Sequence, residues 1–226
     1  MKIFQNIRNL IPVGCVGIVY LITFFLLEHR RVPIHIIQGK IDTMIPFCEY
    51  FIIPYLLWFL YVTATVLYFA CFSDNKESYR KLCICLLTGM IVFLVVSYIY
   101  PNGQNLRPVL FGDNVFERLV MNLYQTDTAT NILPSLHVFY SVVCCIALVL
   151  DEKVSKSRIL TGMIYILTIS IVLSTMFLKQ HSIIDVVMAL MLNGVCYDLF
   201  YNESYHLWRF YHPFANIRHK RKGISL

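Results

Sequence analysis

The sequence predicts an all-α, polytopic membrane protein with about six transmembrane helices in one bundle. Hydrophobic residues make up 58% of the 226 and charged residues only 14%, whereas a soluble domain is about half apolar and a quarter charged. Apolar runs of about 20 residues recur, each long enough to cross a hydrocarbon core of about 30 Å as a helix. Because the polar connections are short, we expect one membrane domain over residues 1–226 and no soluble domain.

The predicted helices follow these apolar runs, since backbone groups in lipid must be satisfied within their own segment. The runs are Leu10–Leu27, Pro46–Phe72, Leu82–Tyr100, Pro134–Leu150, Ile159–Leu178 and His181–Tyr201. The first run follows basic residues, as a signal peptide would. However, it is long for a signal core and ends in Glu28-His29-Arg30-Arg31 without a small-residue cleavage site, so we interpret it as a retained helix.

Basic residues predict the orientation, because cytoplasmic segments carry an excess of Lys and Arg. With the N-terminus inside, most of the 19 fall on the cytoplasmic side: Lys2, Arg8, Lys76, Arg80, Lys81, Lys153, Lys156, Arg158, Arg209, Arg218, Lys220, Arg221 and Lys222. Arg30 and Arg31 fall on the other side. We therefore predict an integral protein of the cell membrane with both termini cytoplasmic.

The eight cysteines predict neither a disulfide framework nor a metal site, because most lie inside apolar runs. Cys83-x-Cys85 lacks the second pair that a zinc site needs. We expect no metal, no cofactor and no nucleic-acid partner.

The longest connection, Pro101–Leu133, is polar, and such loops often carry function. Within it, Val115–Tyr124 spaces its apolar residues near helical period and predicts a short interfacial helix. The tail after Tyr205 mixes aromatic and basic residues. We interpret it as an interfacial belt and a topology anchor, with recognition of anionic lipid as the alternative.

Three polar clusters need explanation, because ionisable groups at membrane depth are costly. They are Asn102–Pro108, Pro134–His137 and Lys179–Asp185. The third predicted helix ends at the first cluster, and the fourth and sixth begin at the other two. Helix parity thus places all three at the extracytoplasmic ends of helices 3, 4 and 6, where they can form one pocket.

The first two clusters carry groups that bind phosphate. Pro134 suits the first position of a helix, so the amides of Ser135, Leu136 and His137 would be free donors at a helix end that favours anions. Arg107 can offer a two-pronged contact to phosphoryl oxygens.

The third cluster pairs His181 with Asp185, four residues later. On a helix the two would share one face, so the carboxylate could fix the imidazole tautomer for nucleophilic attack. Each element alone has a structural explanation, as an interfacial histidine, a loop turn or a structural pair. Their common order and face favour catalysis.

Arg107-Pro108, Pro134-Ser135-Leu136-His137 and His181 with Asp185 resemble the motifs of the type 2 phosphatidic acid phosphatase superfamily. That superfamily also includes the vanadium haloperoxidases and the sphingomyelin and inositol phosphorylceramide synthases. The resemblance covers about residues 82–201, which we interpret as the catalytic part.

The chain departs from the family at two cations. The family's Lys before Arg-Pro falls on Tyr100, and its Arg before the second His falls on Thr175. Lys179 lies near the site in sequence and is a candidate substitute. Fewer cations suit a phosphodiester, which carries one negative charge, better than a monoester that approaches two.

The resemblance implies that His181 attacks phosphorus, Asp185 orients it and His137 protonates the leaving alkoxide. Arg107, Ser135 and Lys179 would bind the phosphate. The implied function is a lipid phosphatase acting on a phospholipid or other lipid phosphate. One alternative is a lipid phosphotransferase, and another is a non-catalytic protein of the same fold. The haloperoxidase branch is not expected, since its members are soluble and rely on the cations missing here.

Overall fold

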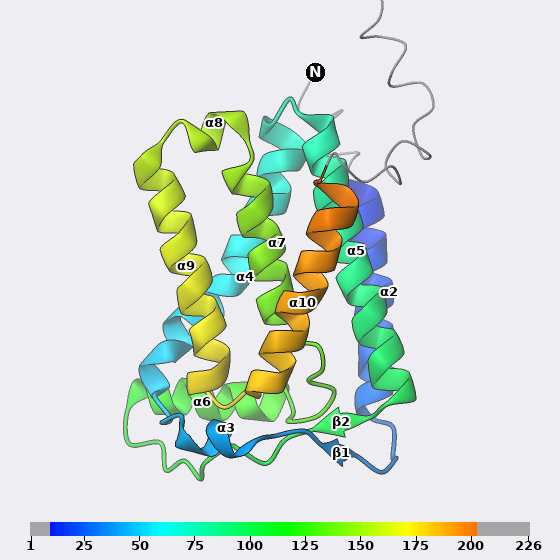
Figure 1. The fold of residues 1–226 in the computed structure, drawn as a ribbon. Coiled ribbons are helices and arrows are strands. Elements are labelled where there is room, and N and C mark those ends of the chain that lie inside the picture. Colours follow the sequence, from blue (N-terminus) through cyan, green and yellow to red (C-terminus); the bar gives the residue numbers. More distant parts are fainter. Residues whose placement is uncertain (1–9, 203–226) are drawn as a thin grey trace, which may run out of the picture.

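The computed structural model describes residues 10–202, and this part of the chain is mostly helical (Figure 1). The all-α prediction is therefore confirmed. The long helices are α2 (Leu10–Glu28), α4 (Ile52–Leu67), α5 (Lys76–Ile99), α7 (Leu136–Val149), α9 (Arg158–Phe177) and α10 (Ile183–Phe200). The short elements are β1 (His35–Ile36), α3 (Lys40–Met44), η1 (Glu49–Phe51), η2 (Tyr68–Phe72), β2 (Asn102–Gly103), α6 (Val115–Thr126) and α8 (Glu152–Ser155).

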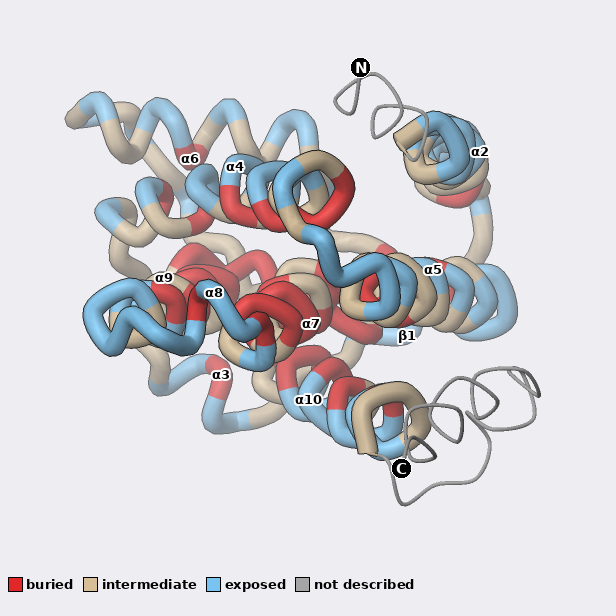
Figure 2. The backbone as a smooth tube through the Cα atoms, turned by 90° about the horizontal axis from the view of Figure 1, so that it is seen from above, coloured by how far each residue is buried: buried red, intermediate tan, exposed pale blue. Residues whose placement is uncertain are grey.

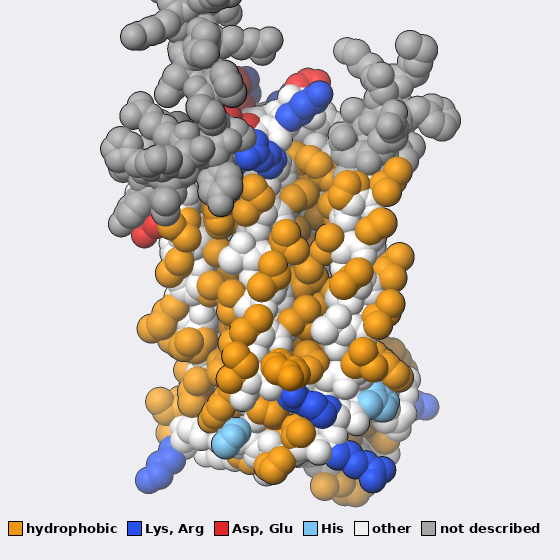
Figure 3. All heavy atoms as spheres, turned by 90° about the vertical axis from the view of Figure 1, so that its right-hand side faces the viewer, with side chains coloured by type: hydrophobic (Ala, Val, Ile, Leu, Met, Phe, Trp, Pro, Cys, Tyr) orange, Lys and Arg blue, Asp and Glu red, His pale blue; other side chains and the backbone are white. Residues whose placement is uncertain are grey.

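Five of the described helices are long and apolar enough to cross a membrane. They are α2, the continuous segment Glu49–Phe72 that joins η1, α4 and η2, and then α5, α9 and α10. Figure 3 shows hydrophobic side chains gathered in a broad band over the length of the bundle, with Lys and Arg toward its two ends. These features indicate an integral membrane protein. The charged N-terminus and C-terminal tail used for the orientation lie outside the described residues.

The fourth predicted helix, Pro134–Leu150, is present as α7 and is shorter than expected. It has 14 residues, or about 21 Å at 1.5 Å per residue, because its cap is Ser135 and it ends at Val149. The position of α7 accounts for its short length. In Figure 2 it runs through the middle of the bundle, among α4, α5, α9 and α10. Its core residues Val138, Phe139 and Cys144 are fully buried.

The helix α2 lies at the edge of this bundle, beside α5 (Figure 2). Only Leu27 of its residues is buried. The rings of Tyr20 and Phe24 pack against that of Phe93 on α5, with centroids 6.3 and 6.0 Å apart. Most of α2 is therefore available to lipid.

Gly89 on α5 makes room for the Phe139 ring of α7. A Cβ at position 89 would overlap this ring, which is fully buried. We expect Gly89→Ala to destabilise the protein by about 1–3 kcal/mol, the usual cost of overpacking a core, measured as melting temperature in detergent. Gly162→Ala is the matched control, since a Cβ at that helical glycine meets nothing within 4 Å. Equal melting temperatures for the two variants would contradict the close contact.

One end of the bundle is covered by connecting segments, drawn at the bottom of Figure 1. β1 pairs in parallel with β2, with His35 opposite Asn102, and Gly103 forms an antiparallel bridge with Thr130. The predicted interfacial helix is present as α6, which lies across this end (Figure 1). Segments that are far apart in sequence are therefore held together at the end of the bundle where α2, α5 and α9 end and α4, α7 and α10 begin.

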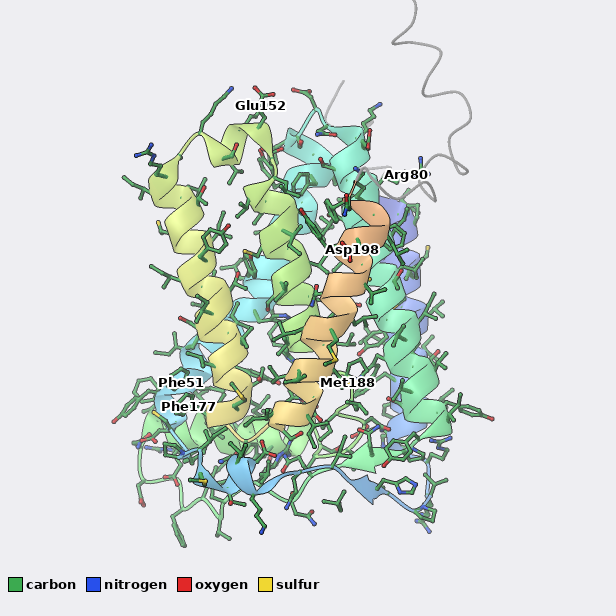
Figure 4. The ribbon with its side chains drawn as sticks, viewed as in Figure 1. Phe51, Arg80, Glu152, Phe177, Met188 and Asp198 are labelled. Carbon is green, nitrogen blue, oxygen red and sulfur yellow. The ribbon has the colours of Figure 1, made fainter. Side chains whose placement is uncertain are left out.

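Aromatic stacking holds the start of the second span at this same end. The rings of Phe51 in η1 and Phe177 at the end of α9 stack with centroids 4.5 Å apart, and Figure 4 shows both at the lower end of the bundle. This contact brings the first turn of α4 next to the connection between α9 and α10.

Candidate active site

The three polar clusters meet at the covered end. The Ser135 amide donates to the backbone oxygen of Asp185 at 3.3 Å, and Nη2 of Arg107 donates to Oε1 of Gln180 at 2.5 Å. The rings of His137 and His181 lie 5.9 Å apart between centroids. The structure thus brings together residues that the sequence places in three separate loops.

His181 is held by Asp185, though not by the geometry that the spacing predicts. α10 begins at Ile183 with Ser182 as its cap, so His181 precedes the helix instead of sharing a face with Asp185. The Asp185 carboxylate turns back over the cap, where Oδ2 accepts from the Ser182 amide at 2.9 Å and lies 3.3 Å from Nδ1 of His181. Its Oδ1 accepts from the Ser182 hydroxyl at 2.9 Å.

This pairing indicates which nitrogen of His181 is left free of Asp185. The carboxylate of Asp185 is fully buried and can only accept while ionised, so Nδ1 of His181 carries the shared proton. Nε2 of the neutral ring then has a free lone pair. The His181 side chain keeps 9% of its exposure, so this lone pair lies in a nearly enclosed position.

His137 is clamped between two aromatic rings of α4. Its ring stacks on Tyr55 with centroids 4.6 Å apart and packs against Trp58 at 4.2 Å. The Tyr55 hydroxyl donates to Oδ2 of Asp127 at 3.1 Å, which fixes that ring. Nε2 of His137 is buried without a hydrogen-bond partner among the described residues. A fixed ring with a free nitrogen is suited to exchange a proton with a bound group.

The start of α7 differs from the prediction. Pro134 is not the first helical residue, because Ser135 is the cap and its Oγ accepts from the Val138 amide at 3.4 Å. The Ser135 amide is already used by Asp185. The helix end therefore offers the amides of Leu136 and His137, which have no acceptor within the helix.

The guanidinium of Arg107 already forms hydrogen bonds within the protein. Its guanidinium donates to the backbone oxygens of Tyr124, Asp127 and Thr128 at 3.1, 2.7 and 2.9 Å, and to Gln180. Burial lowers its pKa, an effect that the Asp127 carboxylate opposes. The predicted two-pronged contact with phosphate does not fit this arrangement, because both terminal nitrogens are occupied. Of the three Arg107 nitrogens, only Nε is buried without a hydrogen-bond partner among the described residues.

Lys179 also differs from its predicted role. Its ammonium donates to the backbone oxygens of Asp42 at 2.6 Å and Ile45 at 2.5 Å, at the end of α3. Burial lowers the Lys179 pKa, while the Asp42 carboxylate raises it. The ammonium therefore fastens the loop before α10 to α3 and does not stand in for a missing phosphate-binding cation in this conformation.

The two positions where the family has cations are both occupied by structural contacts. The Tyr100 ring stacks on His35 with centroids 4.4 Å apart. Thr175 is fully buried, and its backbone oxygen accepts from the amides of Gln180 and His181 at 2.9 and 3.0 Å. Neither side chain replaces a cation.

The sequence assigned no specific role to two groups that hold the site. Oδ1 of Asp42, on α3, accepts from the Ile183 amide at 2.7 Å and so fixes the start of α10. The carbonyl of the Asn102 side chain accepts from the amides of Ile132 and Leu133 at 2.9 and 3.0 Å, which fixes the loop before α7. Their only sequence signal is a polar residue in a connection between apolar runs.

The aromatic clamp of His137 was also missed. Tyr55 and Trp58 lie three residues apart in an apolar run, where their spacing is the only signal.

No family model, curated protein or solved structure matches the chain.

Proposed function

We propose that the chain is an integral-membrane lipid phosphatase of the type 2 phosphatidic acid phosphatase superfamily, which hydrolyses a lipid phosphate ester through a phosphohistidine on His181. The observation that carries the proposal is the pair of histidines. They lie near the starts of two different helices, yet their rings lie 5.9 Å apart, with His181 held by a buried carboxylate. The motif resemblance supports the same assignment.

In the first step, the Nε2 lone pair of His181 attacks phosphorus. The N–P bond forms as the bond from phosphorus to the lipid oxygen breaks, and His137 gives its proton to that leaving oxygen. Asp185 stabilises the positive charge on the His181 ring. In the second step, water attacks phosphorus, His137 takes a proton from it, and the N–P bond breaks to release phosphate.

The site would face the extracytoplasmic side of the cell membrane. α2 begins and α10 ends at the opposite end of the bundle (Figure 1), so both termini would lie on the cytoplasmic side. The opposite end of the bundle, from the start of α5 and the segment around α8, carries Lys76, Lys81, Lys153 and Lys156, which supports this orientation.

A lipid phosphotransferase, resembling inositol phosphorylceramide or sphingomyelin synthase, is the second candidate. It is favoured by the cations: Arg107 and Lys179 donate to carbonyl oxygens, so neither is placed to contact a dianionic monoester directly in this conformation. A phosphodiester donor has one charge less. In this reaction a lipid alcohol replaces water in the second step.

Product analysis of the purified protein tests both candidates. The protein and His181→Ala are given labelled phosphatidic acid, a diphosphate lipid, and a phosphodiester lipid with candidate alcohols. Free phosphate that is lost in the variant supports the phosphatase. Head-group transfer without free phosphate supports the phosphotransferase, and inactivity on every substrate favours a non-catalytic protein of this fold.

A further inference from the structure

The amide of Gln180 has one end bound and one end free. The residue is 2% exposed, and its carbonyl Oε1 accepts from Nη2 of Arg107 at 2.5 Å. A guanidinium can only donate, so the end facing Arg107 is the carbonyl and the other end is the NH₂ group. This Nε2 is buried without a partner among residues 10–202. Buried donors in proteins are nearly always paired, so the free end needs an explanation.

Contacts lead from Gln180 to His137 in four steps. Arg107, which binds Gln180, also donates to the backbone oxygen of Asp127 at 2.7 Å. The Asp127 carboxylate accepts from the Tyr55 hydroxyl at 3.1 Å, and the Tyr55 ring stacks on His137. The free amide therefore belongs to the same network as the unpaired Nε2 of His137.

The network closes through His181. This residue follows Gln180 directly, and its ring lies 5.9 Å from that of His137. The backbone amides of Gln180 and His181 both donate to one oxygen, that of Thr175, so the two residues are held as a unit. A closed ring of contacts with unpaired nitrogens from Gln180 and His137 is suited to a ligand rich in acceptor oxygens, as a phosphoryl group is.

We propose that Gln180 is a substrate-binding residue whose Nε2 donates to an unesterified oxygen of the lipid phosphate, and that Arg107 is a positioning residue that acts through it. This inference rests on the function proposed above. Arg107 fixes the amide orientation, and its charge polarises the amide so that the NH₂ group is a stronger donor. The cation then favours phosphate binding without touching the substrate.

The substitution Gln180→Glu separates this role from a structural one. Glutamate keeps an oxygen toward Arg107 and adds an ion pair, so the melting temperature should equal or exceed that of the parent protein. It replaces the free donor by an acceptor with negative charge. We expect kcat/KM for a lipid phosphate to fall at least about 10-fold, consistent with loss of a hydrogen bond to a charged group, and the inhibition constant of orthovanadate to rise. Gln180→Ala should lose less activity but more stability.

The matched control is Gln38→Glu, which makes the same change at the same end of the molecule. Oε1 of Gln38 accepts from the Asn105 amide at 2.7 Å, and glutamate keeps this bond. Its kinetics should equal those of the parent protein. Arg107→Lys should raise the orthovanadate inhibition constant in the parent protein and leave it unchanged in the Gln180→Ala background.

The outcomes are distinct. Unchanged kcat/KM and orthovanadate inhibition in Gln180→Glu, beside an active parent protein, would overturn this inference and leave the proposed function standing. An effect of Arg107→Lys that persists in the Gln180→Ala background would overturn the positioning role. Absence of His181-dependent turnover in the parent protein would overturn the proposed function and this inference with it.

Discussion

Replacement of His181 by alanine should abolish turnover of every substrate that the parent protein uses. The expected loss is complete because the proposed phosphohistidine forms on this ring. Asp185 should matter through the same ring. Its carboxylate lies 3.3 Å from Nδ1 of His181, so Asp185→Asn should weaken control of the tautomer and lower turnover without removing the nucleophile.

The measurement is turnover together with trapping of the covalent intermediate from substrate labelled in its phosphate. Label that is stable to base and labile to acid should appear on the parent protein and be absent from His181→Ala. His29→Ala is the control, since His29 is an exposed histidine at the same end of the bundle. Full activity in purified His181→Ala would refute the mechanism.

Replacement of His137 should lower turnover at least about 10²-fold, the low end of the range for general acid–base catalysis. Alanine also leaves a gap between Tyr55 and Trp58, which pack on the two sides of the ring. His137→Phe is therefore the better variant, because phenylalanine fills the clamp but cannot transfer a proton. Both variants should show the loss, and the phenylalanine variant should keep the melting temperature closer to that of the parent protein.

A substrate with a different leaving group tests the role of His137 as general acid. A nitrophenyl phosphate departs without protonation, so the loss caused by His137→Phe should shrink markedly with that substrate and remain large with a lipid alcohol. An equal loss with both substrates would assign His137 to binding or packing instead of proton transfer.

The apolar runs predicted most helices well, because hydropathy over about 20 residues directly reports the cost of transfer to lipid. α5 nevertheless begins at Lys76 and not at Leu82, because its first turn is polar and is capped by Asn75. α7 is shorter than its run. A hydropathy pattern does not tell a central helix shielded by its neighbours from one that must span the bilayer alone.

Convergence of the three clusters was predictable, because helix parity requires it once the number of crossings is known. The roles of the cations were not. Arg107 and Lys179 are bound by backbone oxygens of Asp127 and Asp42, and backbone acceptors leave no mark in a sequence. The free amide of Gln180 was hidden for the same reason, since its significance depends on the contact that occupies its other end.

The hydrogen bonds from Lys179 to the backbone at α3 join the motif-bearing part of the chain to a segment that precedes it. Residues 82–201 contain every motif that resembles the family, yet the segment that secures their geometry lies outside that range. Asp42 fixes the start of α10, and Tyr55 and Trp58 clamp His137. A chimera that received only residues 82–201 from this chain would carry the candidate site residues without the segments that hold them, so the proposed chemistry also requires the part of the chain that contains Asp42, Tyr55 and Trp58.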